Sequence, residues 1–222
     1  MTLSADDIAG RLSEIQGRIA RAAERARRDP AEVRLVAVTK THSAETVRTA
    51  AKIGIGVFGE NRVAEGVEKI QALRAEFPNL EWRLIGPLQT NKAKPALQWF
   101  SVIESLDRER LARRLEGLLA AENRTFPVLL EVNLGGEETK SGAAPGEVEA
   151  LAASVLDCPH LDVRGLMAVP PFAIASFALA RPASPCCRKA SMSAGKAPLE
   201  AVGRSMMPAL VKAPMLCWLF RS

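Results

Sequence analysis

The chain has 222 residues, 48% of them hydrophobic, which is enough for a sizeable core in one large domain or two small ones. Its net charge of +5 is uneven, because residues 172–222 hold seven basic side chains and one acidic side chain, whereas residues 1–171 hold 23 basic and 24 acidic ones. This near-neutral body argues against a nucleic-acid-binding protein. No segment approaches the ~20 apolar residues that cross a bilayer, and no secretion signal is recognisable, so we expect a cytoplasmic protein without a membrane partner.

The four cysteines give no sign of a metal site or a disulfide framework. Cys158 lies in the neutral body, and Cys186, Cys187 and Cys217 lie in the basic end. Adjacent cysteines do not have the two-residue spacer of common zinc sites. We therefore expect free thiols and no bound metal.

Short strands and helices alternate along residues 1–171. A helix over 4–28 is followed by the strand EVRLVAV, a helix between Ser43 and Gly54, and a strand ending in FGEN. Next come a helix with Val63, Val67, Ile70 and Leu73 on one side, the strand EWRLIGP, the short helix NKAKPALQWF and the strand SVIESL. The last elements are a helix over 108–123 capped by Asp107, the strand PVLLEVNL, a helix over 145–156 and the strand LDVRGLMAV. Six β/α units in succession predict an α/β protein with a parallel sheet.

Two architectures fit this alternation, an open doubly wound sheet and a closed (β/α)8 barrel of the TIM type. No dinucleotide fingerprint follows the first strand, and no Gly-Lys-Ser/Thr phosphate loop is present, so the barrel is favoured. In a (β/α)8 barrel the carboxyl ends of the strands carry the functional side chains.

Lys40 directly follows the first strand, in the stretch LVAVTKTHSAETV. A lysine partly desolvated at a barrel mouth has its charged form disfavoured and can form a Schiff base with an aldehyde. An ordinary solvated lysine at a strand end fits the same residues. Polar residues follow the other strands as well, and taken singly they are typical of turns and caps: Glu60, Asn61, Gln89, Thr90, Asn91, Asn133, Lys140 and Ser141.

Five motifs in order over residues 5–171 resemble the pyridoxal-phosphate homeostasis proteins, the YggS/PROSC family: LVAVTKTH, FGENRVAEGVEKI, WRLIGPLQTNKAK, EVNLGGEETKSG and RGLMAVPP. The resemblance implies a barrel similar to the N-terminal domain of alanine racemase. It also implies that Lys40 holds pyridoxal 5'-phosphate as an internal aldimine and that Asn61 lines the cofactor pocket. Members are thought to buffer the cofactor without catalytic turnover, which suggests a monomeric carrier that serves apo-enzymes. One departure is Arg83, where the family commonly has histidine.

An enzyme remains the alternative, either an amino-acid racemase or a Schiff-base aldolase on a similar barrel. A racemase needs an acid or base on the opposite face of the cofactor, which the related enzyme takes from its second domain. Nothing in this sequence supplies such a group, and this favours the carrier.

The resemblance stops near Pro171, and residues 172–222 have a different composition. Family members continue with two further strands whose loops hold the cofactor phosphate. The sequence motifs of these two loops are not found in residues 172–222. We therefore divide the chain into a barrel domain, 1–171, and an atypical basic tail, 172–222, expected to be disordered or irregular, with a reading-frame shift near residues 170–174 as its origin. A natural lineage-specific tail is the alternative. Loss of the last two strands predicts an incomplete barrel and a relative that binds the cofactor poorly or not at all.

Overall fold

The computed structural model describes residues 4–135, 141–168 and 215–218. The described residues fall into two compact units, with the boundary between Ile103 and Glu104, and the strand Met215–Trp218 belongs to the first. The domain boundary expected at residue 171 lies outside the described residues. None of the helices in these ranges combines the length and the apolar character that a membrane span requires.

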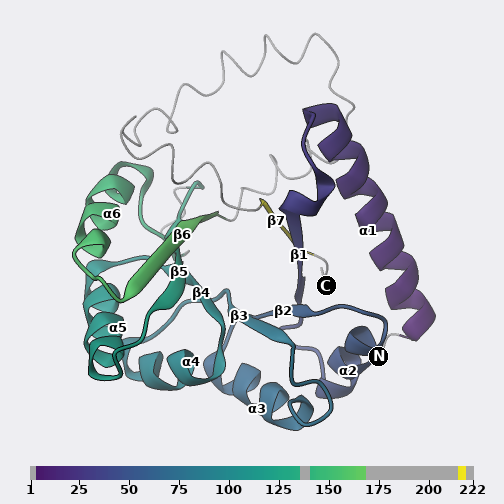
Figure 1. The fold of residues 1–222 in the computed structure, drawn as a ribbon, viewed down its shortest axis with the longest axis horizontal. Helices are drawn as coiled ribbons and strands as arrows, with labels where there is room; N and C mark the ends of the chain where they lie inside the picture. Colours follow the sequence, from purple (N-terminus) through teal and green to yellow (C-terminus); the bar gives the residue numbers. More distant parts are fainter. Residues whose placement is uncertain (1–3, 136–140, 169–214, 219–222) are drawn as a thin grey trace. The chain divides into compact units, whose positions relative to one another are not determined.

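The first unit is a parallel sheet with helices along one face (Figure 1). Its strands pair in the order β7, β1, β2, β3 and the start of β4, and each pairing is parallel. The elements are α1 (Ala5–Ala26), the 3-10 turn η1 (Pro30–Glu32), β1 (Val33–Val38), α2 (Ala44–Lys52), β2 (Val57–Glu60), α3 (Val63–Leu73), β3 (Glu81–Leu84), η2 (Thr90–Lys92), α4 (Ala93–Trp99), β4 (Val102–Leu106) and β7 (Met215–Trp218).

Local capping explains where the first two helices begin and end. Ser4 and Asp7 form a capping box at the start of α1. The Ser43 hydroxyl accepts a hydrogen bond from the Thr46 N–H, as the sequence predicted, and fixes the start of α2. Gly54 follows α2 with φ +97°, a conformation that favours glycine and ends the helix.

The two faces of β2 contact different neighbours. On the helix side, the Phe58 ring lies 5.3 Å from the Trp82 ring. On the other side Gly59 has no side chain, and an added Cβ would come within 3.2 Å of both Val36 and Ile85. Because side chains alternate along a strand, Glu60 lies on the helix side together with Phe58. This position determines which residues Glu60 meets at the functional site.

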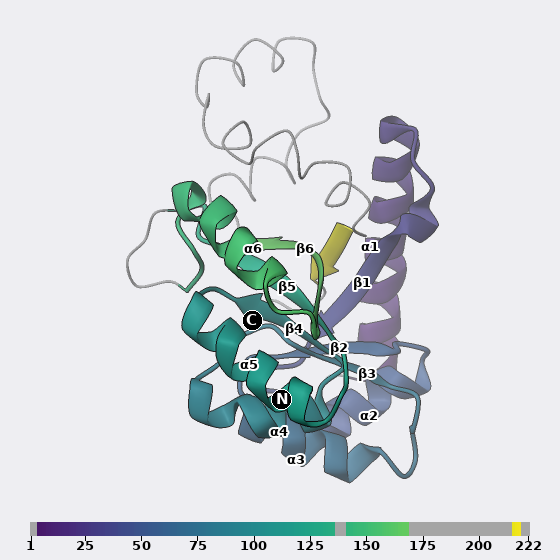
Figure 2. The same ribbon diagram turned by 60° about the vertical axis from the view of Figure 1, so that its left-hand side comes forward.

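The second unit contains the rest of β4 and two further strand and helix pairs (Figure 2). Its elements are α5 (Glu109–Ala121), β5 (Phe126–Val132), η3 (Pro145–Glu147), α6 (Val148–Leu156) and β6 (Leu161–Ala168). Strands β5 and β6 run parallel, with an irregularity between Val128 and Leu129. The prediction that Asp107 caps α5 is wrong: Arg108 is the N-cap without a side-chain cap bond, and Asp107 forms an ion pair with Arg108 instead.

The six strands predicted from residues 1–171 are all present, in the predicted order. Four residues of the expected irregular tail form a seventh strand, β7, which pairs with β1 through Val33–Val36. The remainder of the tail lies outside the described residues. Cys158 is buried and free, as expected, and the side chains of the other three cysteines are not among those described.

Candidate functional site

Lys40 lies in the turn that follows β1, at the predicted strand end. Val38 pairs with Gly59 of β2, and the Thr39 N–H donates a hydrogen bond to the Gly59 carbonyl at 3.0 Å, so the two strands end side by side. The Lys40 side chain is exposed. The structure thus confirms the place of Lys40 but not the partial desolvation expected there.

Asn61 follows β2 at the same edge of the sheet as Lys40. The Ile85 N–H donates to the Glu60 carbonyl at 2.9 Å, which ties the end of β3 to this turn. A Cβ on Gly86 would lie 2.3 Å from the Asn61 carbonyl oxygen, a distance that no side chain tolerates. Glycine at position 86 is therefore required for the close approach of these two backbone segments.

Residues 39–42 form a hydrogen-bonded β-turn, here called the 39–42 turn. The His42 N–H donates to the Thr39 carbonyl at 3.0 Å, and Lys40 and Thr41 occupy the two central positions. Thr41 has φ +66°. A β-branched residue in this left-handed region is strained by about 1–3 kcal/mol, so the surrounding structure must hold the turn in place.

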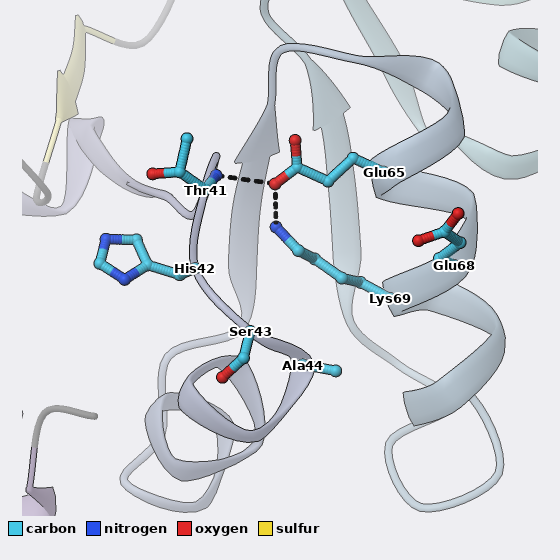
Figure 3. A pocket seen from close by; sticks show the side chains of 7 residues that line it. All are labelled: Thr41, His42, Ser43, Ala44, Glu65, Glu68 and Lys69. Atoms are coloured by element: carbon cyan, nitrogen blue, oxygen red, sulfur yellow. Dashed lines mark hydrogen bonds and ion pairs between the residues drawn. The ribbon is translucent and has the colours of Figure 1, made fainter. Parts of the chain in front are cut away.

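A group of charged and polar side chains, of which Thr39, Glu60 and Lys69 are buried, holds this turn from the helix side. We call it the Lys69 cluster: Lys69 and Glu65 of α3, Glu60 of β2, and Thr39 and Thr41 of the turn. Figure 3 shows three of its members, Lys69, Glu65 and Thr41. The Lys69 Nζ donates to the Thr39 carbonyl at 2.7 Å, to Glu60 Oε1 at 2.7 Å and to Glu65 Oε1 at 2.8 Å. The Thr41 N–H donates to Glu65 Oε1 at 2.7 Å, and the Thr39 hydroxyl donates to Glu60 Oε1 at 2.6 Å.

Burial and pairing act in opposite directions on the two carboxyl groups. Burial raises the pKa of Glu60, and the hydrogen bonds from Lys69 and Thr39 counteract it only in part. For Glu65, partial burial also favours a higher pKa, but the bonds from Lys69 and from the Thr41 N–H outweigh it, and the pKa is lowered. The bonds from Lys69 and from the Thr41 N–H therefore stabilise the charged form of Glu65.

A pocket of about 470 Å³ lies beside the 39–42 turn, between the start of α2 and α3 (Figure 3). Lys40 and Asn61 are not among its lining residues, which are Thr41, His42, Ser43, Ala44, Glu65, Glu68 and Lys69. Burial, together with the Lys69 charge, lowers the pKa of His42. The pocket is thus lined mainly by polar residues of the helix side and does not contain the predicted cofactor residues.

The departure at Arg83 and the other polar residues predicted at strand ends have diverse surroundings. Arg83 is buried on β3 and pairs with Glu81, with its Nε 2.7 Å from Glu81 Oε1. In the second unit, Ser141 donates to Glu131 Oε1 at 2.9 Å. Gln89 lies just before η2 without a side-chain cap bond, and Lys140 lies outside the described residues.

Sequence reasoning missed Lys69 and Glu65, although a signal for them was present. Both belong to the motif FGENRVAEGVEKI, four residues apart, and Lys69 lies on the buried side of α3 with Ile70 and Leu73. A lysine on the apolar face of a helix needs a buried anionic or carbonyl partner. The acidic residue one turn earlier, Glu65, is such a partner.

The family described as "Alanine racemase, N-terminal domain" matches residues 11–194 of the chain. The chain belongs to this family. It is also 44% identical over 163 residues to the pyridoxal phosphate homeostasis protein of Pseudomonas aeruginosa, covering 73% of this chain and 70% of that protein. The protein of the same name from Escherichia coli K12 is 41% identical over 166 residues, covering 74% and 71%. The chain is thus a member of the pyridoxal phosphate homeostasis proteins.

Solved structures agree with this family. An unknown protein from Bifidobacterium adolescentis matches with a TM-score of 0.71 and 32% identity, over 76% of this chain and 71% of the other. PipY of Synechococcus elongatus PCC7942, solved with PLP bound, matches with a TM-score of 0.65 and 28% identity, over 94% and 87%. An alanine racemase of Clostridium difficile, at 16% identity over 64% of this chain and 37% of that one, shares the fold with a TM-score of 0.54. The predicted fold class, an incomplete β/α barrel of the alanine racemase N-terminal type, is confirmed.

Proposed function

We propose that this protein binds pyridoxal 5'-phosphate in cofactor homeostasis and holds it reversibly through Lys40, with Asn61 beside it. The observation that carries the proposal is the placement of Lys40 at the carboxyl end of β1, next to the turn that bears Asn61. The names of the relatives and the PLP bound to PipY point to the same ligand.

The residues present fit the chemistry of this cofactor. Among the described residues none forms a hydrogen bond or ion pair with the Lys40 amine, and the side chain is exposed. The amine is therefore accessible to a carbonyl group. When bound, the cofactor supplies an aldehyde, with which a deprotonated lysine amine condenses with loss of one water molecule. No oxidant or reductant is needed. The role of this chain is to present the amine and to keep the turn that carries it in one conformation.

The test is absorbance of the purified protein with added pyridoxal 5'-phosphate, before and after borohydride reduction, followed by peptide mapping. We expect a saturable band and a reduced adduct on Lys40, both absent from Lys40→Ala. The matched control is Lys94→Ala, which removes an exposed lysine of α4 and is expected to bind normally. Adducts scattered over surface lysines, with the same yield in Lys40→Ala, would contradict the proposal.

We infer that the protein acts as a carrier without turnover of its own. Racemisation requires two groups that exchange a proton on opposite faces of the cofactor, and the relatives from Pseudomonas aeruginosa and Escherichia coli are named homeostasis proteins rather than racemases. The cofactor-loaded protein is expected to leave L-alanine unracemised, as measured by chiral chromatography. Formation of D-alanine that is lost in Lys40→Ala would favour the racemase-like alternative.

As a carrier, the protein would be cytoplasmic and monomeric and would supply apo-enzymes with cofactor. Light scattering of the purified protein checks the monomer. Transfer is checked by mixing the loaded protein with an apo-enzyme that needs this cofactor. Recovery of the enzyme's activity faster than with the same concentration of free cofactor supports delivery.

The basic tail is proposed to come from a reading-frame shift near residues 170–174. The matches to the relatives from Pseudomonas aeruginosa and Escherichia coli cover 73% and 74% of this chain and so leave part of it unmatched. Resequencing the gene decides the question. An alternative frame that encodes the missing phosphate-binding strands supports the proposal, and its absence contradicts it.

A further inference from the structure

We propose that Lys69 and Glu65 are positioning residues for Lys40: they clamp the 39–42 turn from α3 and so hold the lysine in its binding conformation. This inference rests on the proposed function, because it concerns how the cofactor lysine is presented. Neither residue is expected to touch the cofactor. Both act on the backbone that carries Lys40.

The first step of the argument is the strain in the turn. Thr41 has φ +66°, a conformation that threonine adopts rarely because its branched side chain crowds the backbone. Left to itself, this residue would return to an extended or helical conformation and move Lys40 with it. The turn therefore keeps its shape only where other contacts hold it.

The second step is that the clamp contacts the backbone on both sides of Lys40. Lys69 donates to the carbonyl of the preceding residue, Thr39, at 2.7 Å. Glu65 accepts from the N–H of the following residue, Thr41, at 2.7 Å. Lys69 and Glu65 are themselves joined at 2.8 Å, so the two backbone contacts form one connected unit.

The third step is that the clamp is anchored in rigid elements. Lys69 is 5% exposed and lies on the buried face of α3. It also bonds Glu60 at the end of β2, which is fully buried and which accepts from the Thr39 hydroxyl. An added Cβ on Gly66 would lie 2.4 Å from the Phe100 ring, so α3 is closely packed at this point and cannot shift easily.

The fourth step is that packing alone does not explain a lysine at this position. An apolar side chain of similar length would fill the same space without the cost of desolvating an ammonium group. What an apolar side chain cannot do is bond the Thr39 carbonyl and fix Glu65 against the Thr41 N–H. The backbone contacts therefore distinguish the clamp from a simple core residue.

The test compares Lys69→Met, which keeps the length of the side chain, with Lys94→Met as the exposed control. Two quantities are measured: amide hydrogen exchange of residues 39–42 in the cofactor-free protein, and cofactor affinity with mapping of the borohydride-reduced adduct. In Lys69→Met we expect exchange at the turn to be about tenfold faster and affinity at Lys40 about tenfold weaker, in keeping with the strain that the turn stores. Lys94→Met is expected to leave both unchanged.

Two further variants keep the proposal testable where Lys69→Met fails to fold. Glu65→Gln keeps the size of the side chain and is expected to speed exchange at the Thr41 amide with a smaller loss of affinity. Thr41→Asn relieves the strain, because asparagine adopts the left-handed conformation readily. Combined with Lys69→Met or Glu65→Gln, it is expected to restore most of the affinity, which a merely structural role of Lys69 would not explain.

The outcomes separate this inference from the proposed function. A wild-type protein without an adduct on Lys40 contradicts the proposed function, and the clamp is then judged by hydrogen exchange alone. A wild-type adduct on Lys40, with exchange and affinity unchanged in Glu65→Gln and in folded Lys69→Met, overturns the clamp.

Discussion

The ends of β2 and β5 each carry a buried glutamate, and the two are held very differently. Glu60 at the end of β2 bonds a lysine and a threonine hydroxyl, both within 2.7 Å. Glu131 near the end of β5 accepts a hydrogen bond from the Ser141 hydroxyl at 2.9 Å. Burial raises the pKa of both carboxyl groups. One oxygen of each, Oε2, is buried without a hydrogen-bond partner among the described residues.

The difference shows that burial alone does not determine how a carboxylate at a strand end contributes to stability. Glu60 belongs to a charged cluster that ties β1, β2 and α3 together, and removing one member leaves the others uncompensated. Among the described residues no cation pairs with Glu131, so burial disfavours the charged form of this carboxyl group and protonation relieves that cost. The end of β2 is therefore expected to be sensitive to mutation, and the end of β5 to be tolerant of losing its charge.

The largest effect is expected at the end of β2, for Lys69→Met. The substitution leaves two carboxyl groups beside an apolar side chain, and breaking a buried ion pair from one side costs about 3–5 kcal/mol of unfolding free energy. Urea unfolding followed by circular dichroism measures it. A loss below about 1 kcal/mol would mean that Lys69 contributes no more than an ordinary surface lysine, and the expected difference between the ends of β2 and β5 would be refuted.

Gly142→Ala tests the backbone at the end of β5. Gly142 has φ +110°, and an added Cβ would lie 2.7 Å from the Asn133 nitrogen, so strain and overlap together are expected to cost about 2–3 kcal/mol. Thermal unfolding measures the loss. The matched control is Gly146→Ala, where an added Cβ meets nothing within 4 Å, and an equal loss in both variants would refute the steric reason.

Glu131→Gln sharpens the comparison through its pH dependence. Because burial raises the pKa of Glu131 in the folded state, the folded protein binds this proton more tightly than the unfolded chain does. The contribution of Glu131 to stability is thus most favourable below the unfolded pKa and is lost as the pH rises through the folded pKa. The variant is expected to match the wild type at pH 4 and to gain up to about 1 kcal/mol relative to it at pH 8. Urea unfolding at the two pH values checks the direction of the change. A variant less stable than the wild type at pH 8 would contradict the prediction.

The smallest effect is expected for Glu32→Gln, which breaks an exposed ion pair. Glu32 Oε2 lies 3.0 Å from Arg28, and both side chains are largely exposed. Solvent screens such pairs, so the unfolding free energy is expected to change by less than about 0.5 kcal/mol. The same urea experiment measures it. A change as large as that for Lys69→Met would show that burial does not separate the two kinds of pair.

Sequence patterns predicted the strands and the place of Lys40 because these depend on local order. Apolar runs gave the six strands, and Ser43 marked the start of a helix through its own neighbours in the chain. The Lys69 cluster was missed because two of its bonds join residues 30 and 24 positions apart, which only the packing of α3 on β2 and β3, beside the 39–42 turn, brings together. The φ of Thr41 was not predictable either, since threonine is not typical of that conformation. The cap expected from Asp107 failed because its carboxylate pairs with the adjacent Arg108 instead.

The pairing of β7 with β1 has a consequence for the order in which the protein can form. Strand β1 leaves the ribosome well before its partner along Val33–Val36, which is Met215–Trp218. At about 5–20 residues per second, the lysine-bearing strand is complete many seconds before that neighbour exists. During this interval one edge of β1 has open hydrogen-bonding groups, which is the state in which strands pair with other chains. The nascent chain therefore exposes the same strand that later presents Lys40.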